Sequence, residues 1–369
     1  MLQRFCRLTG FLFMFFLWSV SCKKNNTPIN NTPDPAPLPI TVDVYVAGYE
    51  QVGNVAIAKL WKNGTPYNVS DGTKNATATG VCVNGQDVYV CFNEAEGSRS
   101  RPKLWKNGVV SPLLFPGTNE TFAIASANAV YKGVVAGYYQ SESNGPFTSA
   151  VYWDDNGSKQ LSNAATNNAE AYSIHIKTIN NFTRTSVAGE VEIYENGVSQ
   201  KRAFFFGNQF SDPKLNILSD GRAPGYGYAC FINDNGFTYT AGRYDGRPML
   251  WFEGGTSVAL SSNLGTAYGL YVNGYTQVYA VGNESINGKF VARLWSGDYQ
   301  TSQLQSLTLG TGQYQSGATG IQVIDGNTFV CGDEYDATGK TYAKYWKNGA
   351  PVIVGGPNSY ASAIYVVKK

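Results

Sequence analysis

Histidine and charged residues are scarce in this chain of 369 residues. There is one histidine, and Asp, Glu, Lys and Arg together make up only 15% of the residues. A single histidine excludes the usual metal sites built from several imidazoles. The low charge, with 14% aromatic residues, excludes an intrinsically disordered acidic or basic protein. Glycine (41 residues) and tyrosine (25 residues) are abundant, and both favour strands and turns over helices.

Sequence motifs for cofactors and covalent catalysis are also missing. No G-x-x-x-x-G-K loop is present, which excludes the common nucleotide-binding loop. There is no C-x-x-C pair, so we interpret Cys82, Cys91, Cys230 and Cys331 as buried free thiols. A Ser-His-Asp triad would have to use His175, which we interpret as a packed, hydrogen-bonded core residue. We therefore predict no catalytic residue, no metal and no cofactor.

The first 21 residues have the features of a secretory signal. Arg4 and Arg7 precede an apolar run at 11–18, which is too short to span a bilayer as a helix. Small residues then lead into Cys22, and this junction resembles the lipobox of bacterial lipoproteins, in a form common in Bacteroidota. The resemblance implies acylation of Cys22 and an outer-membrane lipoprotein that faces the periplasm or the cell surface. The alternative is an ordinary signal peptide cut nearby, with Cys22 incidental.

Residues 22–40 would form a lipid-anchored tether to a folded domain. Five prolines and four asparagines occur in 23–40, which is typical of a solvated chain with polyproline character. Removal of residues 1–21 leaves equal numbers of basic and acidic side chains, 26 of each. This balance gives no basic surface for nucleic acid, so we expect the membrane as a partner, through the lipid, and no nucleic acid.

One pattern recurs seven times from residue 41 onward. Its clearest marker is the sequence Ala-Lys-Leu-Trp-Lys-Asn-Gly at 58–64, and further copies follow at intervals of 44 to 53 residues. The aromatic marker residues are Trp61, Trp105, Trp153, Phe206, Trp251, Trp295 and Trp346. We interpret this column as packing between neighbouring repeats, because ligand stacking would not require a copy in every repeat.

The repeats also predict the fold. Each contains short segments of alternating polarity separated by turn dipeptides such as Asn-Gly, which indicates antiparallel strands. Four strands in about 47 residues match one blade of a β-propeller. The segment at 361–366 is of the innermost type that the first repeat lacks, and its pairing with 43–50 would close the ring. We predict an all-β, seven-bladed propeller of four-stranded antiparallel blades over 41–369, with an open β-solenoid as the alternative.

The repeats are similar to the HAF-type extracellular repeat. The Gly-Val-Val-Ala-Gly-Tyr sequence at 133–138 and the Ala-x-Leu-Trp segments match the Gly-x-Val-Val-Gly and Ala-Phe-Leu-Trp segments of that family. The His-Ala-Phe triplet that names it does not occur. The resemblance covers the whole propeller and implies a secreted or surface-exposed protein, without implying any catalytic residue.

A column of acidic residues looks functional at first. Four repeats place a glutamate at the end of one strand and a lysine or arginine at the start of the next, whereas the other three repeats have uncharged residues at both positions. The pairs are Glu50 with Lys59, Glu94 with Lys103, Glu284 with Arg293, and Glu334 with Lys344. We therefore predict cross-strand ion pairs, which makes these glutamates poor candidates for acid/base catalysis.

Another column has no such pairing. It is the middle residue of the Ala-x-Gly segment, which would lie in the innermost strand at the rim of the central channel. Three consecutive repeats place Tyr172, Tyr228 and Tyr268 there, and the others have small polar residues. Tyrosine suits sugar rings or peptide side chains because it joins an apolar ring to a polar tip. We hypothesise a ligand site lined by Tyr172, Tyr228, Tyr268, Thr79, Asn128 and Thr319. The alternative is that the rings only cover neighbouring strands.

These observations favour a monomeric, lipid-anchored binding module that recognises a glycan or a peptide at the central funnel. Two alternatives of other classes stay open. A scaffold for envelope assembly or adhesion would bind proteins through the polar loops at 93–101, 139–149 and 191–202. A glycan-processing enzyme would need unpaired carboxylates in the funnel. The candidates for these are Asp333, Glu190 and Asp245.

Overall fold

A computed structural model describes residues 41–114, 122–141, 147–162, 168–195, 197–209, 212–301 and 304–369. The signal segment, Cys22 and the tether lie outside the described residues, so their assignments stay predictions. The regular elements of the described residues are all β-strands. In chain order they are β1 (Val42–Val52), β2 (Val55–Lys62), β3 (Thr65–Asn68), β4 (Ala76–Asn84), β5 (Asp87–Glu96), β6 (Arg99–Lys106), β7 (Val109–Pro112), β8 (Phe122–Tyr131), β9 (Val134–Ser141), β10 (Ser149–Asp154), β11 (Gly157–Gln160), β12 (Ala169–Ile179), β13 (Phe182–Glu195), β14 (Val198–Gln209), β15 (Asp212–Ile217), β16 (Gly225–Ile232), β17 (Thr238–Tyr244), β18 (Arg247–Phe252), β19 (Ser257–Ala259), β20 (Gly265–Asn273), β21 (Gln277–Ile286), β22 (Lys289–Asp298), β23 (Gln305–Thr308), β24 (Ser316–Ile324), β25 (Asn327–Tyr335), β26 (Thr341–Lys347), β27 (Ala350–Pro357) and β28 (Ser359–Lys368).

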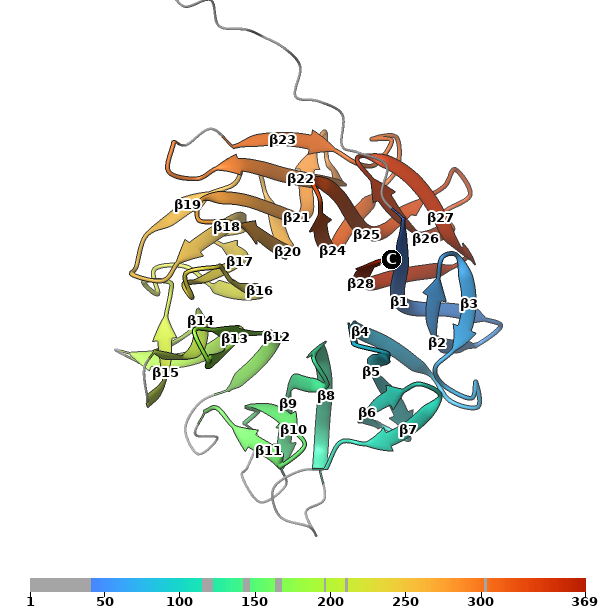
Figure 1. The fold of residues 1–369 in the computed structure, drawn as a ribbon, viewed down its shortest axis with the longest axis horizontal. Helices are drawn as coiled ribbons and strands as arrows, with labels where there is room; N and C mark the ends of the chain where they lie inside the picture. The colour runs from blue at the N-terminus through green and yellow to red at the C-terminus, as the bar shows by residue number, and fades with distance from the viewer. Residues whose placement is uncertain are drawn as a thin grey trace, which may run out of the picture. The chain divides into compact units, whose positions relative to one another are not determined.

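The strands form seven four-stranded antiparallel sheets arranged in a ring (Figure 1). Six sheets take four consecutive strands each, from β4–β7 to β24–β27, and the seventh has the order β28-β1-β2-β3. Figure 1 shows the first strand of each of the six sheets, and β28 of the seventh, nearest the centre. The predicted seven-bladed propeller is confirmed.

The ring is closed by the last strand. β28 pairs antiparallel with β1, from Val42 opposite Lys368 to Glu50 opposite Ser359. The backbone N–H of Lys369 also donates to the carbonyl of Thr41 at 3.0 Å. The C-terminal strand is therefore the innermost strand of the first blade, as predicted, and it covers the edge that β1 would otherwise expose.

The repeated Asn-Gly dipeptides form tight hairpin turns between the third and outermost strands of three blades. The turns begin at Asn63, Asn107 and Asn348. The Asn63 φ is 52° and the Gly64 φ is 83°, a combination that suits the twist of a two-residue hairpin. The Asn63 side chain also accepts a hydrogen bond from the Val44 N–H at 2.8 Å. The dipeptide thus sets the turn and ties it to the neighbouring strand.

The tryptophans of the marker column fill the space between blades. The most buried ones, each at most 4% exposed, are Trp61, Trp153, Trp251, Trp295 and Trp346. Trp61 on β2 packs with Phe329 and Cys331 on β25 of the neighbouring blade, so one ring joins two sheets. Trp105 differs in being only half-buried. The predicted structural role of the column is confirmed for the buried members, whose loss would cost about 3–5 kcal/mol by leaving a cavity.

The four predicted cross-strand ion pairs are present, and their partners are diagonal to each other. Lys59 Nζ lies 3.3 Å from the Glu50 carboxylate, and the other three pairs are also in contact. The partners are not directly opposite each other, because Glu50 faces Ile57 in the register and Lys59 faces Gly48. The charges therefore meet diagonally across the two strands, a spacing that long side chains can bridge.

In two of the pairs the glutamate, Glu284 or Glu334, also holds a loop. Glu334 accepts hydrogen bonds from both the backbone N–H and the hydroxyl of Thr311, each at 2.6 Å. Burial alone would raise the pKa of Glu334, but the hydrogen bonds from Lys344 and Thr311 hold it below its ordinary value. These contacts leave the glutamate a structural rather than a catalytic group.

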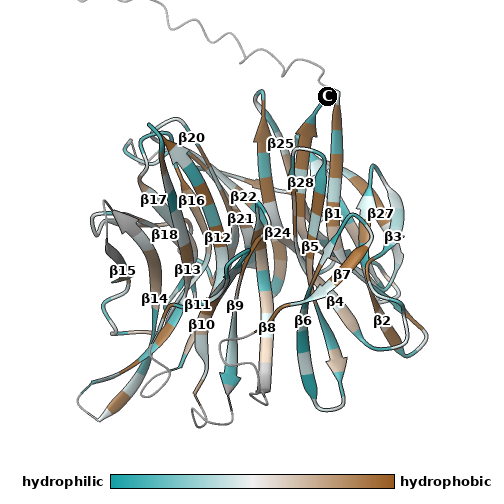
Figure 2. Ribbon diagram, turned by 60° about the horizontal axis from the view of Figure 1, so that its bottom comes forward, coloured by the Kyte–Doolittle hydropathy of each residue, from teal (hydrophilic) through white to brown (hydrophobic). Residues whose placement is uncertain are grey.

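The cysteines on the described strands are buried free thiols, as predicted from the sequence. Burial raises the pKa of Cys91 and Cys331 to about 12, so both are protonated and unreactive near neutral pH. Figure 2 shows hydrophobic residues along β1, β25 and β28, in keeping with their burial between blades. Within the part of the chain that the structure describes, no helix is long and apolar enough to cross a membrane.

Candidate functional site

Every innermost strand carries a β-bulge at the same place. In β4, Ala78 pairs with Phe92 and Gly80 pairs with Cys91, which leaves Thr79 as the extra residue. The same shift occurs in the other six blades. The bulged residues are Thr79, Asn128, Tyr172, Tyr228, Tyr268, Thr319 and Ser362. This is the column that the sequence indicated, and a bulge is a known way to redirect a side chain beside a functional site.

In six of the seven blades a glycine lies opposite the bulge, where the backbones of the two strands come very close. A Cβ at Gly242 would lie 1.8 Å from the Tyr226 carbonyl oxygen, and one at Gly282 would lie 1.9 Å from the Thr266 carbonyl oxygen. Equivalent close approaches occur at Gly48, Gly137, Gly189 and Gly332. Phe92 takes this place in the remaining blade. The recurring Ala-Gly dipeptide of the second strand is therefore explained by contact with the bulged strand.

The bulged residues line a central cavity of about 560 Å³. All seven innermost strands contribute to its wall. The structure thus brings together the six predicted site residues and adds Ser362. Since no ligand contact is described, their role in binding stays a prediction.

Three tyrosines form an aromatic arc on one side of this cavity, which we call the tyrosine arc (Tyr172, Tyr228 and Tyr268). The ring centroids of Tyr172 and Tyr228 are 5.2 Å apart, and those of Tyr228 and Tyr268 are 5.3 Å apart. Tyr226 stacks on Tyr228 with an interplanar angle of 2°. Tyr268 is 36% exposed. The Tyr172 hydroxyl donates to Glu170 at 2.8 Å, which fixes one end of the arc.

The small polar residues of the column use their side chains between blades. Thr79 donates to the Ala127 carbonyl at 2.7 Å, and Thr319 donates to the Ala361 carbonyl at 2.9 Å. The Asn128 amide donates to the carbonyl of Ala171 at 2.7 Å. Each acceptor immediately precedes the bulged residue of the next blade. We call these three contacts the bulge latches, and they give Thr79, Asn128 and Thr319 a structural role that the sequence did not reveal.

A second aromatic layer lies three residues further along the same strands. His175 lies between Tyr131 and Phe231, with centroid distances of 4.6 and 4.3 Å, and Phe231 contacts Tyr271 at 4.9 Å. His175 Nδ1 accepts a hydrogen bond from the Ile232 N–H at 3.2 Å. Burial lowers the pKa of His175 to about 3, so the imidazole is neutral at physiological pH. The predicted packed, hydrogen-bonded histidine is confirmed.

The three candidate carboxylates have different surroundings. Asp245 is exposed in a turn with a φ of 50°. Glu190 is buried and contacts Lys201, and burial raises the pKa of Glu190 above its ordinary value. Asp333 is half-buried, and burial raises its pKa to about 7. Among the described residues no cluster of three or more His, Cys, Asp or Glu could hold a metal ion.

Two of the three predicted loops are extended hairpins instead. Residues 93–101 lie almost entirely in β5 and β6, and 191–202 lie in β13 and β14 with residue-by-residue pairing from Val191 opposite Arg202 to Glu195 opposite Val198. Polar composition indicated loops here, but alternating side chains on two exposed strands produce the same composition. Of 139–149, part lies outside the described residues.

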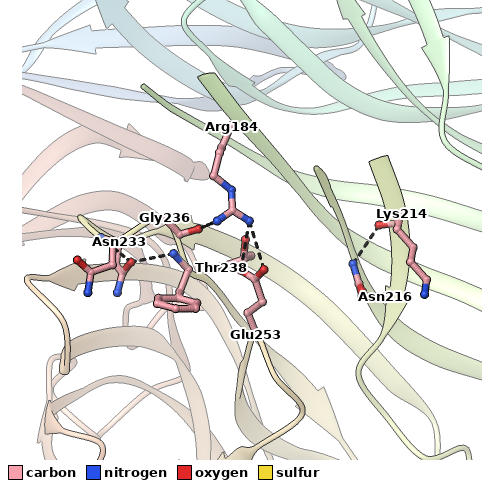
Figure 3. Close-up of polar contacts among 9 residues, drawn as sticks. Arg184, Lys214, Asn216, Asn233, Gly236, Thr238 and Glu253 are labelled. Carbon is pink, nitrogen blue, oxygen red and sulfur yellow. Dashed lines mark hydrogen bonds and ion pairs between the residues drawn. The ribbon is translucent and has the colours of Figure 1, made fainter. Parts of the chain in front are cut away.

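A separate polar network joins two neighbouring blades (Figure 3). Arg184 on β13 contacts the Gly236 carbonyl, and its Nη2 lies 3.2 and 3.4 Å from the two carboxylate oxygens of Glu253. Glu253 also accepts from the Thr238 N–H at 2.6 Å. Figure 3 shows the guanidinium between these partners, well apart from Lys214 and Asn216. Because the charges satisfy each other, we assign this network to blade packing.

No family model matches the sequence, and no curated protein matches it. Among solved structures, the β-propeller domain of the Trilobed protease from Pyrococcus furiosus is similar, with a TM-score of 0.50, 11% identity, and coverage of 86% of this chain and 95% of that one. That domain is described as having an open velcro topology, whereas β28 closes the ring here.

Two further structures are more distant in shape. A puromycin-hydrolyzing peptidase from Mycobacterium tuberculosis has a TM-score of 0.49 and 10% identity, over 84% of this chain but only 53% of the peptidase. TolB from Acinetobacter baumannii has a TM-score of 0.41 and 9% identity, over 72% of this chain and 63% of TolB. Similarities at this level of identity concern the fold alone. The chain is a β-propeller protein of seven four-stranded blades, closed by its last strand.

Proposed function

We propose that this protein is a binding module that recognises a glycan or a peptide through the tyrosine arc. The observation that carries the proposal is the one-sided lining of the central cavity. Three of the bulges place tyrosines on one side of the cavity. In contrast, Thr79, Asn128 and Thr319 use their side chains in hydrogen bonds to the next blade. Adjacent rings with polar tips offer stacking surface and hydrogen bonds to a ligand that is flat and polar at its edges.

We propose a binding role rather than a catalytic one. Glu190 forms an ion pair with Lys201, Asp245 lies in an exposed turn, and neither lines the central cavity. We further propose that lipid on Cys22 and the 22–40 tether attach the propeller to the outer membrane. Replacement of Cys22 by Ser should release the protein from the membrane fraction; retention of Cys22→Ser in that fraction would contradict the anchor.

A glycan and peptide array tests the binding proposal. The purified protein should bind one class, and a variant with Tyr172, Tyr228 and Tyr268 changed to Ala should bind at least tenfold more weakly. The matched control changes Tyr67 and Tyr275 to Ala, which are 48% and 59% exposed and do not line the cavity. Equal binding by the triple variant and the wild type would overturn the proposal, and turnover of a bound glycan would make the protein an enzyme.

A scaffold function is a second candidate, because the β13–β14 hairpin presents apolar side chains at its tip. Tyr194 is 67% exposed and Val198 is 56% exposed. Solitary apolar residues are common on surfaces, but a long hairpin that projects them can dock a protein. Capture of an envelope protein that is lost on changing both residues to Ser, and kept in the tyrosine-arc variant, would favour the scaffold.

A further inference from the structure

We propose that a second site, in the two blades that follow the tyrosine arc, binds a primary alkylammonium group. The site consists of Asp333 and Tyr335 on β25, Tyr49 on β1 and Tyr360 on β28, which we call the Asp333 cluster. A lysine side chain and the amino terminus of a peptide both carry this chemical group. The proposal does not depend on the tyrosine arc.

The Asp333 carboxylate lacks a partner. Within the described ranges, no hydrogen bond or ion pair reaches it. The nearest cation, Lys344, is taken by Glu334, with Nζ 2.8 Å from the carboxylate. A half-buried carboxylate without a partner is costly, because burial removes water and nothing replaces it.

The equivalent residue of another blade shows what a structural side chain does here. Asn93 comes directly after Phe92, the residue of β5 that lies opposite the bulge, and Asp333 comes directly after Gly332, the corresponding residue of β25. It accepts from the Ala127 N–H at 2.8 Å and donates to the Ala127 carbonyl at 2.9 Å, so it ties its blade to the next one. No equivalent contact is made by Asp333. Its carboxylate is therefore available to a ligand.

Tyrosine rings lie on the strands next to the carboxylate. Tyr335 comes two residues after Asp333 on β25 and so lies on the same face of the sheet, and β28, which carries Tyr360, packs against β25. Tyr49 and Tyr360 stack with centroids 4.7 Å apart and an interplanar angle of 17°. In keeping with this arrangement, burial, the nearby phenol of Tyr360 and the charge of Asp333 raise the pKa of both Tyr49 and Tyr335. Ring faces attract a cation, and a carboxylate accepts its N–H groups, so the combination suits an ammonium ion better than an anion or a neutral sugar.

Space for a ligand exists beside the carboxylate. Gly317 lies directly opposite Asp333 in the register, and a Cβ built on it would meet no atom within 4 Å. The corresponding positions of the flanking blades carry the side chains of Thr266 and Tyr360. The position opposite the unpaired carboxylate therefore carries no side chain and is open.

The charged and titratable groups that face Asp333 set the pH dependence. They are Cys331 and Tyr335 on its own strand, Lys344 on β26, Tyr49 on β1 and Tyr360 on β28. Burial raises the pKa of Asp333 to about 7, opposed only in part by Lys344. Since the ammonium ion binds the ionised form, its affinity should rise about tenfold between pH 6 and pH 8, with release of a proton on binding at the lower pH.

Calorimetric titration of the full-length protein with butylammonium tests the site. The wild type should give saturable one-to-one binding at pH 8, Asp333→Asn should weaken it at least tenfold, and uncharged 1-butanol should not bind. Asp245→Asn is the matched control, because it removes an exposed carboxylate in a turn where Asn is tolerated. A thermal melt verifies that each variant is folded.

Two peptides distinguish the source of the ammonium group. One is an N-acetylated peptide with a single lysine, and the other has a free amino terminus and no lysine. Binding of only one assigns the site to that source, and binding of butylammonium alone assigns it to free amines. No saturable binding of butylammonium to the wild type, equal binding to Asp333→Asn, or equal binding of 1-butanol would each overturn the proposal. None of these results depends on the tyrosine arc, so the two proposals fail separately.

Discussion

The seven β-bulges around the central cavity carry two kinds of side chain, small polar residues in four blades (the polar half) and tyrosines in three (the aromatic half), and the two kinds make different contacts. In the polar half, Thr79 and Thr319 turn back to bond the carbonyl that precedes the next bulge. In the aromatic half, Tyr228 and Tyr268 contact each other and face the cavity. A short threonine side chain uses its hydroxyl in a hydrogen bond to the backbone of the next blade, whereas a longer tyrosine side chain extends past that backbone. The comparison separates residues that hold blades together from residues that remain available to a ligand.

The largest expected effect is common to both halves, because both contain glycines that lie against the backbone of the bulged strand. Gly242→Ala in the aromatic half and Gly332→Ala in the polar half each place a Cβ within 2 Å of a carbonyl oxygen. Each should lower the free energy of unfolding by more than about 3 kcal/mol in urea denaturation. Gly317→Ala, which meets open space, is the control and should cost less than about 1 kcal/mol. A clear difference between the first two variants would mean that the bulges are not equivalent.

The next effect concerns His175, in the aromatic half, and Gln322 at the same position of the polar half. Both accept a backbone N–H from the next blade, His175 from Ile232 and Gln322 from Val366 at 2.9 Å. Because burial lowers the pKa of His175 to about 3, the unfolded chain binds a proton that the folded chain does not between about pH 6.5 and pH 3. The contribution of His175 to the free energy of unfolding should be complete above pH 6.5 and should fall by up to about 1.4 kcal/mol per pH unit below it.

His175→Gln should keep the hydrogen bond and remove this term. The variant should therefore lose less stability than the wild type between pH 7 and pH 4.5, as measured by urea unfolding at both values. An identical pH dependence of the two proteins would show that His175 does not titrate on unfolding as expected.

A smaller effect tests the bulge latches. Thr319→Val leaves the Ala361 carbonyl without its donor and should lower the free energy of unfolding by about 1–2 kcal/mol. Tyr268→Phe, which alters the aromatic half by one exposed hydroxyl, should leave the unfolding free energy within about 0.5 kcal/mol. Thermal or urea unfolding measures both, and a loss of equal size would remove the distinction between the halves.

The smallest effect has the opposite sign. Burial raises the pKa of Asp333 to about 7. The carboxyl group therefore contributes favourably to the free energy of unfolding below pH 4, and this contribution is lost as the pH rises through 7. Because Asp333 is only half-buried, solvent screens part of this effect, and Asp333→Asn should stabilise the protein at pH 8 by about 1 kcal/mol and make no difference near pH 3.5. Unfolding at both pH values measures this. Destabilisation at pH 8 would show that the carboxylate has a structural partner.

The repeats made the blade count and the closure predictable. The Trp marker and the Asn-Gly turn recur in register, and 361–366 supplied the innermost strand that the first repeat lacked. These signals can be recognised in a single sequence because they depend on local chemistry, such as the positive φ at Asn63. The hairpin at 191–202 was not recognised, because exposed strands there are as polar as a loop.

The site was only half predictable. The tyrosine column was visible as a composition difference between repeats, but the bulge that directs it depends on the exact pairing of the innermost strand with the second strand of its blade. The structural use of Thr79 was also hidden, since its acceptor lies 48 residues away. Asp333 was noticed as a carboxylate, yet its missing partner and the opening at Gly317 are properties of three-dimensional packing alone.

The pairing of β28 with β1 has a consequence for the order of assembly. Three strands of the first blade are synthesised early, but β28, its innermost strand, follows all six other blades, so these three strands wait with an open edge until Ser359–Lys368 is made. Contacts over such a sequence distance form slowly, and an uncovered edge invites pairing with another chain. A nascent or truncated chain should therefore depend on assistance until the last strand closes the ring.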